Sequence, residues 1–217
     1  MLGLRNNSSL RWGQGCQYIF NNNKYFIIPV NNGVNSWLVC FQININTQLL
    51  EHSYQYIRQI GNGVVNWITV DPISNHIFVP RYSYSRPVNI SFFDIYDVKF
   101  PYFDILRLPQ VAYINDQINA QCGVFSNDGI LYLLDNRRET SGFRAYSFGY
   151  DNYYEGFLFT KRKTYRITKP EESVFSSDSQ DMVGITFVQN PRRLMILFRN
   201  EDVGTDNFYL LTIRGLM

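Results

Sequence analysis

Three loops between expected strands hold the residues best suited to chemistry in this sequence. Arginine beside tyrosine can stack on planar groups and donate paired hydrogen bonds to carboxylates, while aspartate can bind a metal ion or transfer a proton. In a repeated β architecture such loops gather on one face, where binding sites usually lie. We take the following as candidate ligand-binding residues: Arg81, Tyr82, Tyr84, Arg86, Asp135, Arg137, Arg199 and Asp202.

The same charges also have a structural interpretation, in which neighbouring loops form surface ion pairs that contribute little individually. A second functional hypothesis is a metal-assisted hydrolase or lactonase that uses Asp135, Asp202 or Asp206. No spacing in the sequence forces two of these carboxylates within the roughly 5 to 9.5 Å that glycoside hydrolysis requires. We therefore expect a non-catalytic protein rather than an enzyme.

Motifs for nucleophilic catalysis, nucleotide binding and zinc binding are absent from the sequence. It contains no G-x-S-x-G, G-x-x-x-x-G-K-[ST], G-x-G-x-x-G or H-E-x-x-H pattern. Its cysteines, Cys16, Cys40 and Cys122, lack the spacing of zinc ligands. We predict no cofactor and no metal site. Buried free thiols are favoured over a Cys16–Cys40 disulfide, which requires that their strands be neighbours.

The composition is that of a globular β protein. The chain has 217 residues, of which 45% are hydrophobic and 17% aromatic, and alanine occurs only at Ala112, Ala120 and Ala145. The strongest helix former is thus nearly absent, while strand formers abound. A net charge of +2 with scattered charges offers no basic stripe for phosphates, so we expect no nucleic-acid partner. No stretch of the sequence is long and apolar enough to predict a membrane span.

A repeated pattern of short apolar strands organises the sequence into four units, at about 13–60, 61–110, 111–168 and 169–217. First strands are predicted at 17–20, 67–70, 121–125 and 182–188, and second strands at 25–30, 76–80, 130–134 and 194–198. Third strands are predicted at 37–43, 90–95, 143–148 and 208–213, and fourth strands at 49–57, 103–108 and within 157–167. The last unit lacks a fourth strand.

We interpret these repeats as one all-β domain over 1–217, a β-propeller-like array of about four four-stranded units. A β-sandwich is the alternative, but it does not require the same rhythm in every quarter. We expect a strand within 2–12 to supply the missing strand of the last unit and close the ring.

A run of cations at 161–166 is the one basic cluster, and aromatic residues accompany it. Such a mixture can bind single-stranded nucleic acid or a carbohydrate. The run also resembles an edge strand that charge protects from aggregation. We favour the edge strand.

Three stretches resemble the Yellow and major royal jelly propellers. These are His76–Tyr82 with Pro87, Cys122–Gly123 before Leu131–Asp135, and Gly184–Phe187. The resemblance implies a six-bladed extracellular protein that binds a small aromatic or amine ligand near its axis. The chain departs from that family in its length, in its cysteine number and in showing no signal peptide.

Taken together, the sequence predicts a non-catalytic binding or structural module that engages a protein, a glycan or a small ligand through its loop face. Aromatic residues and arginine are enriched in interface anchors, which favours a protein or glycan partner. A structural subunit of a large assembly, such as a virion, is a further alternative, with a homo- or hetero-oligomer as its consequence. The compartment is not predicted.

Overall fold

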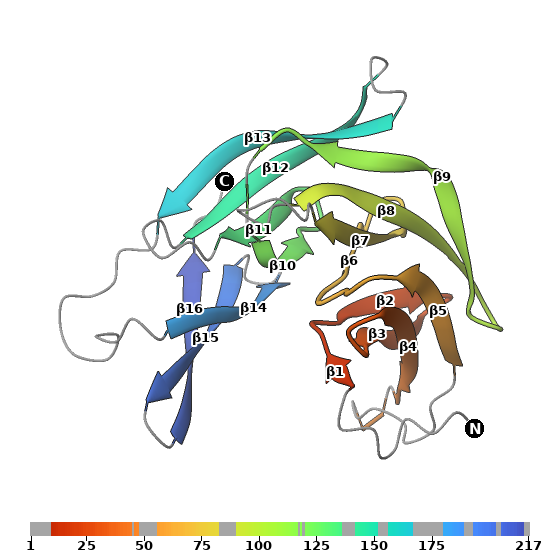
Figure 1. Ribbon diagram of the computed structural model, residues 1–217, viewed down its shortest axis with the longest axis horizontal. Coiled ribbons are helices and arrows are strands. Elements are labelled where there is room, and N and C mark those ends of the chain that lie inside the picture. Colours follow the sequence, from red (N-terminus) through yellow and green to blue (C-terminus); the bar gives the residue numbers. More distant parts are fainter. Residues whose placement is uncertain are drawn as a thin grey trace. The chain divides into compact units, whose positions relative to one another are not determined.

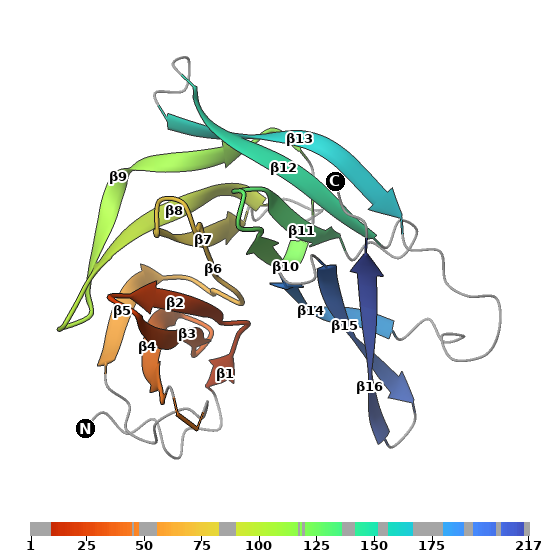
Figure 2. The same cartoon turned by 180° about the vertical axis from the view of Figure 1, so that it is seen from behind.

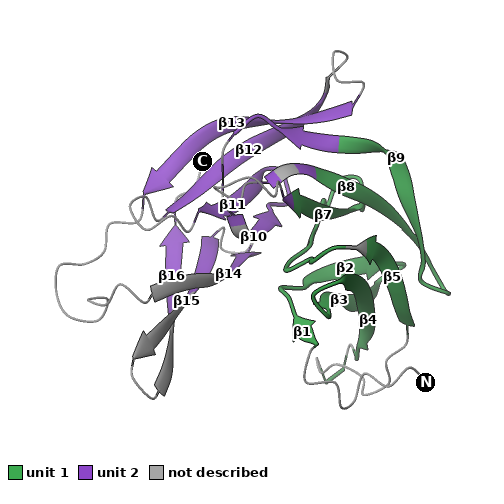
Figure 3. Ribbon diagram, viewed as in Figure 1, with its two compact units in different colours: residues 1–81, 93–111 green, residues 82–92, 112–217 purple. Residues whose placement is uncertain are grey.

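The computed structural model describes residues 10–44, 46–47, 56–82, 90–116, 118, 120–135, 142–151, 156–166, 180–188, 193–202 and 205–214. These residues form strands, turns and extended chain, with no helix among them, and the all-β prediction is confirmed over this part (Figure 1). The chain divides into two compact units, one of residues 1–81 and 93–111 and the other of residues 82–92 and 112–217 (Figure 3).

The first sheet of the first unit is an antiparallel meander. It runs through β2 (Cys16–Phe20), β3 (Asn23–Asn31), β4 (Asn35–Ile43) and β5 (Tyr56–Asn62). The two residues between β2 and β3, Asn21 and Asn22, have φ values of 47° and 63°. Asparagine tolerates this left-handed conformation, which two-residue hairpins require.

The described part of the expected closing strand does not pair with the last sheet. Strand β1 (Arg11–Trp12) pairs with Asn31 and Val30 of β3, not with the last sheet. Residues 2–9 of that prediction lie outside the described residues. Pairing to β3 is favoured because Gly13 follows β1 and its amide donates to the carbonyl of Pro29 at 2.8 Å. A Cβ at Gly13 would collide with the backbone of Asn66, so this close approach requires glycine.

The second meander consists of β6 (Thr69–Val70), β7 (Ile77–Tyr82), β8 (Ile90–Lys99) and β9 (Asp104–Ile114), neighbours in that order. The buried Asp71 caps the turn between β6 and β7, because its carboxylate accepts hydrogen bonds from the amides of Ile73 and Ser74. An aspartate that satisfies turn amides in this way is a local signal that does not depend on the rest of the fold.

The second unit contains a third antiparallel meander, of β10 (Ala120–Phe125), β11 (Leu131–Asp135), β12 (Gly142–Asp151) and β13 (Gly156–Arg166). The β10–β11 turn is capped by the buried Ser126, whose hydroxyl accepts from the amide of Ile130 at 3.2 Å. Residues Phe157–Phe159 of β13 also pair in parallel with Ala112–Ile114 of β9, so the second and third meanders form one eight-stranded sheet in the order β10-β11-β12-β13-β9-β8-β7-β6. The third repeat therefore has the strand order that the sequence predicts.

The last sheet is three-stranded and consists of β14 (Gln180–Val188), β15 (Arg193–Asp202) and β16 (Thr205–Arg214). Strand β14 lies beside β10 in both views of the ribbon (Figures 1 and 2). Within the described residues this sheet has no fourth strand, as the sequence predicts for the last unit.

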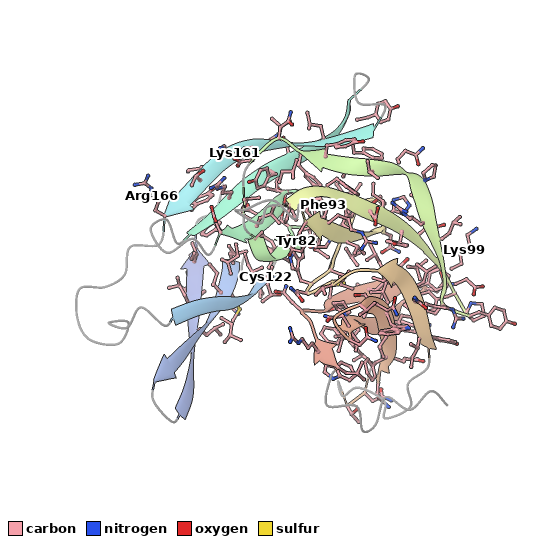
Figure 4. The ribbon with its side chains drawn as sticks, viewed as in Figure 1. Tyr82, Phe93, Lys99, Cys122, Lys161 and Arg166 are labelled. Atoms are coloured by element: carbon pink, nitrogen blue, oxygen red, sulfur yellow. The ribbon has the colours of Figure 1, made fainter. Side chains whose placement is uncertain are left out.

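Aromatic side chains fill much of the core of the first unit. Phe100 stacks on Tyr25 with ring centroids 4.2 Å apart and on Phe20 at 5.1 Å. Phe93, labelled in Figure 4, meets Trp67 edge-on at 5.8 Å. A large share of the aromatic residues that suggested interface anchors therefore stabilises the interior instead.

The three cysteines are free thiols. Cys16 pairs with Ile27 of β3, and Ile27 pairs with Cys40 of β4, so the two cysteines lie two strands apart. Neighbouring strands are about 4.8 Å apart, which puts the two Cα atoms about 10 Å apart and beyond the span of a disulfide. Burial raises the pKa of the Cys40 thiol to about 12, so it stays protonated at neutral pH.

Candidate functional site

Arg81 lies at the end of β7 and forms a buried ion pair. Its Nε donates to Oδ2 of Asp94 on β8 at 2.5 Å, and only 1% of the Asp94 side chain is exposed. Arg107 on β9 donates to the other oxygen of Asp94, also at 2.5 Å. One carboxylate thus links three neighbouring strands through two charge-assisted hydrogen bonds.

Tyr96 extends this cluster, which we call the Asp94 network, to β5. The Tyr96 hydroxyl donates to the carbonyl of Ile60 at 2.9 Å. Burial raises the pKa of Tyr96, and the negative charge of Asp94 raises it further, so the hydroxyl remains a donor. Arg81, predicted as a ligand-binding residue, is placed here to hold the first two sheets of its unit together.

Tyr82 also has a structural contact, because its hydroxyl donates to the carbonyl of Ala120 on β10 at 3.0 Å (Figure 4). Both residues belong to the second unit. This hydrogen bond is consistent with a role for Tyr82 in anchoring the start of that unit.

Asp135, the candidate carboxylate of the hydrolase hypothesis, lies at the end of β11 with 2% of its side chain exposed. Its Oδ2 accepts a hydrogen bond from Arg144 on β12 at 2.5 Å. Arg144 also donates to Oδ2 of Asp116 at 2.7 Å. A guanidinium between two carboxylates neutralises much of their charge, so this carboxylate already has the cationic partner that a metal ion would supply.

Asp116 accepts from two further side chains, the Tyr146 hydroxyl at 2.9 Å and the Lys161 ammonium at 3.3 Å. We call this cluster, with Arg144 and Asp135, the Arg144 network. Burial raises the pKa of the Asp116 carboxyl, but the hydrogen bonds from Arg144, Tyr146 and Lys161 outweigh burial and leave the pKa below its usual value.

This lowered pKa predicts a pH-dependent effect of Asp116→Asn. Because the folded pKa lies below the unfolded one, ionised Asp116 contributes stability above about pH 4, and that contribution is lost as the pH falls through the folded pKa. We expect the variant to lower the free energy of unfolding by about 2 kcal/mol at pH 7 and by less at pH 3. Urea unfolding at both pH values measures the difference, and equal losses would contradict the prediction.

The two networks occupy the same place in consecutive repeats with the charges reversed. Arg81 is the second-last residue of β7 and Asp135 the last residue of β11, and Asp94 and Arg144 lie on the third strands. Asn31 ends the second strand of the first repeat, where it is buried and donates to the carbonyl of Val65 at 3.2 Å. A charged pair between the second and third strands is thus shared by the second and third repeats, which the sequence analysis missed, whereas Asn31 bonds to Val65 outside the third strand.

The other candidate residues have no described side chains. Tyr84, Arg86 and Arg137 lie outside the described residues. Arg199 and Asp202 are residues of strand β15. Among the described candidate residues, Arg81, Tyr82 and Asp135 thus each make a hydrogen bond within their own unit.

Residues 160–166 of β13 form the most exposed cationic segment in the described chain, and we call them the basic edge. All of them are exposed except the half-buried Tyr165, and four carry a positive charge: Lys161, Arg162, Lys163 and Arg166. Over this range β13 pairs with β12 alone, since its pairing with β9 ends at Phe159 (Figure 1). The prediction of a charged edge strand is confirmed.

The basic edge is held in place by its neighbour. The Tyr165 ring stacks on Phe143 of β12 with centroids 4.4 Å apart, and the Lys163 ammonium lies 4.9 Å from the Tyr165 centroid. A Cβ at Gly142 would collide with the carbonyl oxygen of Tyr165, so glycine there lets the two strands stay paired as far as Arg166. Figure 4 shows Lys161 and Arg166 on this strand.

Acid partners are scarce along the basic edge. Lys161 forms an ion pair with Asp116. For Arg162, Lys163 and Arg166, the described part of the chain contains no carboxylate within ion-pair distance. This segment therefore presents cations that are available to a partner.

Two findings concern metal binding and membrane spans in the part of the chain that the structure describes. No group of three His, Cys, Asp or Glu side chains there could hold a metal ion. No helix there is long and apolar enough to cross a membrane.

Comparison with known proteins identifies no family for this chain. No family model matches it, and neither does any curated protein. The resemblance to the Yellow propellers therefore stays a prediction.

Proposed function

We propose that this chain is a non-catalytic binding module, built as a propeller-like array, that engages an acidic protein partner through the basic edge of β13. The observation that carries the proposal is the exposure of four cations along one strand edge, three of them with no described acid partner. Exposed single-sign charge attracts and orients a partner of opposite charge.

Two features support the propeller-like arrangement of repeats. The strands β2–β5, β6–β9 and β10–β13 follow one another as four-stranded meanders in chain order, the strand number of a propeller blade, and the β13–β9 pairing joins the last two meanders into one eight-stranded sheet. In addition, first strands of successive repeats lie side by side within each unit, β2 with β6 and β10 with β14. Such neighbouring is expected where first strands surround a common axis.

A protein partner is favoured over single-stranded nucleic acid because of the aromatic contacts. Proteins that bind single strands without sequence preference stack bases on aromatic side chains. The one aromatic ring of the basic edge, Tyr165, is half-buried and already contacts Phe143 and Lys163. The cations remain accessible, and acidic side chains suit them without any stacking platform.

The test reverses the charge of the three cations without described acid partners. The β13 triple variant carries Arg162→Glu, Lys163→Glu and Arg166→Glu. Its matched control carries Arg11→Glu, Lys99→Glu and Arg214→Glu, three exposed cations on other strands that give the same change in net charge. The probe is octaglutamate, with a single-stranded oligonucleotide and a heparin oligosaccharide as competing polyanions. Binding is measured by calorimetry at low and physiological salt.

We expect octaglutamate to bind the unmodified chain and the control, and to bind the β13 triple variant at least tenfold more weakly. Affinity should fall with added salt because exposed charges are screened. Octaglutamate binding that is equal in all three proteins, or a clear preference for the oligonucleotide or heparin, would contradict the proposal. Circular dichroism and thermal unfolding confirm that the variants are folded, and Gln substitutions at the same positions replace any variant that is not.

A further inference from the structure

We propose that the partner segment is an extended run of consecutive acidic residues, which pairs with the free edge of β13 as an added strand. This inference rests on the proposed function and names its ligand and its mode of binding. It is carried by the unpaired edge, by the faces on which the cations lie, and by the spacing between them.

The free edge supplies the backbone partners. Residues Phe157–Phe159 of β13 are paired on both sides, by β12 and by β9. From Thr160 onward the described residues supply a neighbour on the β12 side alone. An unpaired edge offers N–H and C=O groups to an incoming strand, which is the basis of strand-addition recognition.

A bulge distributes the cations over both faces of the strand. Lys163 pairs with Ala145 and Lys161 with Tyr146, so Arg162 is an extra residue without an opposite partner. As a result, Lys161 lies on the face of Tyr146 and contacts Asp116, whereas Lys163 lies on the other face with Tyr165 and Phe143.

The presence of cations on both faces of β13 determines which partner sequence fits best. Side chains of an extended strand alternate between faces. A strand with acids at every second position would meet the cations of one face only. A run of consecutive acids presents carboxylates to both faces, so it complements Lys163 on one face and Arg166, which opposes Gly142, on the other.

The spacing also favours an extended ligand. Lys161 and Arg166 are five residues apart, which is about 17 Å along a strand. An extended acidic segment has the same rise per residue as β13, so the spacing of its charges matches the spacing of these cations. A helix rises only about 1.5 Å per residue.

Three peptides test the inference on the full chain. The first is octaglutamate, and the second is octaglutamate with its four central amides N-methylated, which keeps the charge but removes backbone donors. The third is a 16-residue Glu-Ser repeat, which has the same number of carboxylates at alternate positions. Each is titrated into the unmodified chain, the β13 triple variant and the matched control.

We expect octaglutamate to bind at least tenfold more tightly than the N-methylated peptide and several-fold more tightly than the Glu-Ser repeat. Equal affinity of octaglutamate and the N-methylated peptide, both lost in the β13 triple variant, would overturn strand pairing and leave the proposed function intact. Equal affinity of octaglutamate and the Glu-Ser repeat would overturn the consecutive-acid specificity. Octaglutamate binding that the β13 triple variant retains would instead overturn the proposed function.

Discussion

Replacing Asp94 with asparagine is expected to lower the free energy of unfolding by about 3 to 5 kcal/mol. The carboxylate is 1% exposed and accepts hydrogen bonds from both Arg81 and Arg107. Its neutral replacement removes the counter-charge that Asp94 supplies to the largely buried Arg81 guanidinium. Arg107 is 57% exposed and can be solvated in the variant, which places the expected loss at the lower end of the range. Urea unfolding followed by fluorescence measures it.

Asp104→Asn is the matched control for this effect. Asp104 pairs with Arg58 at 3.5 Å, and its side chain is 66% exposed. An exposed ion pair contributes less than about 1 kcal/mol, so the control should unfold close to the unmodified chain. If the two variants lose equal amounts of unfolding free energy, burial of Asp94 does not determine its contribution to stability.

Replacing Arg144 with methionine is expected to have a comparable effect, again about 3 to 5 kcal/mol. The side chain donates to both Asp135 and Asp116, so its loss leaves two carboxylates on the second unit without their shared cation. Asp135 is the more affected, because it is almost fully buried. The free energy of unfolding is measured at pH 7, where both carboxylates are ionised in the unfolded chain.

Two further variants separate the charge effect from the loss of packing. Arg214→Met removes an exposed strand arginine and should change stability by less than about 0.5 kcal/mol. The combination of Arg144→Met with Asp135→Asn and Asp116→Asn also removes the charges of the two carboxylates that Arg144 neutralises, and it should recover part of the loss. If the triple combination is less stable than the single variant, uncompensated charge is not the cause.

The hairpins could be predicted from the sequence because their signals are local. The asparagines between β2 and β3, Asp71 before β7 and Ser126 before β11 all act on residues within a few positions of themselves. Turn residues of this kind specify where one strand ends and the next begins. The strand order within each repeat follows from those turns.

The internal contacts of Arg81, Tyr82 and Asp135 could not be predicted from the sequence because they depend on where the strands end. The second strands were predicted to end at residues 80 and 134, whereas β7 continues to Tyr82 and β11 to Asp135. One or two residues moved these side chains from a loop to a sheet, where a neighbouring strand supplies their partners. Asp94 and Arg144 could not be recognised because their partners come from neighbouring strands whose register no local signal specifies.

The basic edge could be predicted because an open strand edge has characteristic residues in the sequence. Cations and bulges at edges prevent uncontrolled pairing with other chains, and both are present between Thr160 and Arg166. Strand β9 has Pro109 along its exposed stretch, which serves the same purpose. The parallel pairing of β13 with β9 could not be predicted, because it joins residues about 45 positions apart in the chain.

Hydrogen exchange of the full chain, with and without saturating octaglutamate, tests the central claim most directly. An added strand would protect the outward-facing amides of the basic edge, so exchange should slow in fragments that contain residues 160–166 and stay unchanged in fragments of the first sheet. The β13 triple variant should show no such slowing. Unchanged exchange over 160–166 at saturation, or protection that lies on another strand instead, would contradict the account.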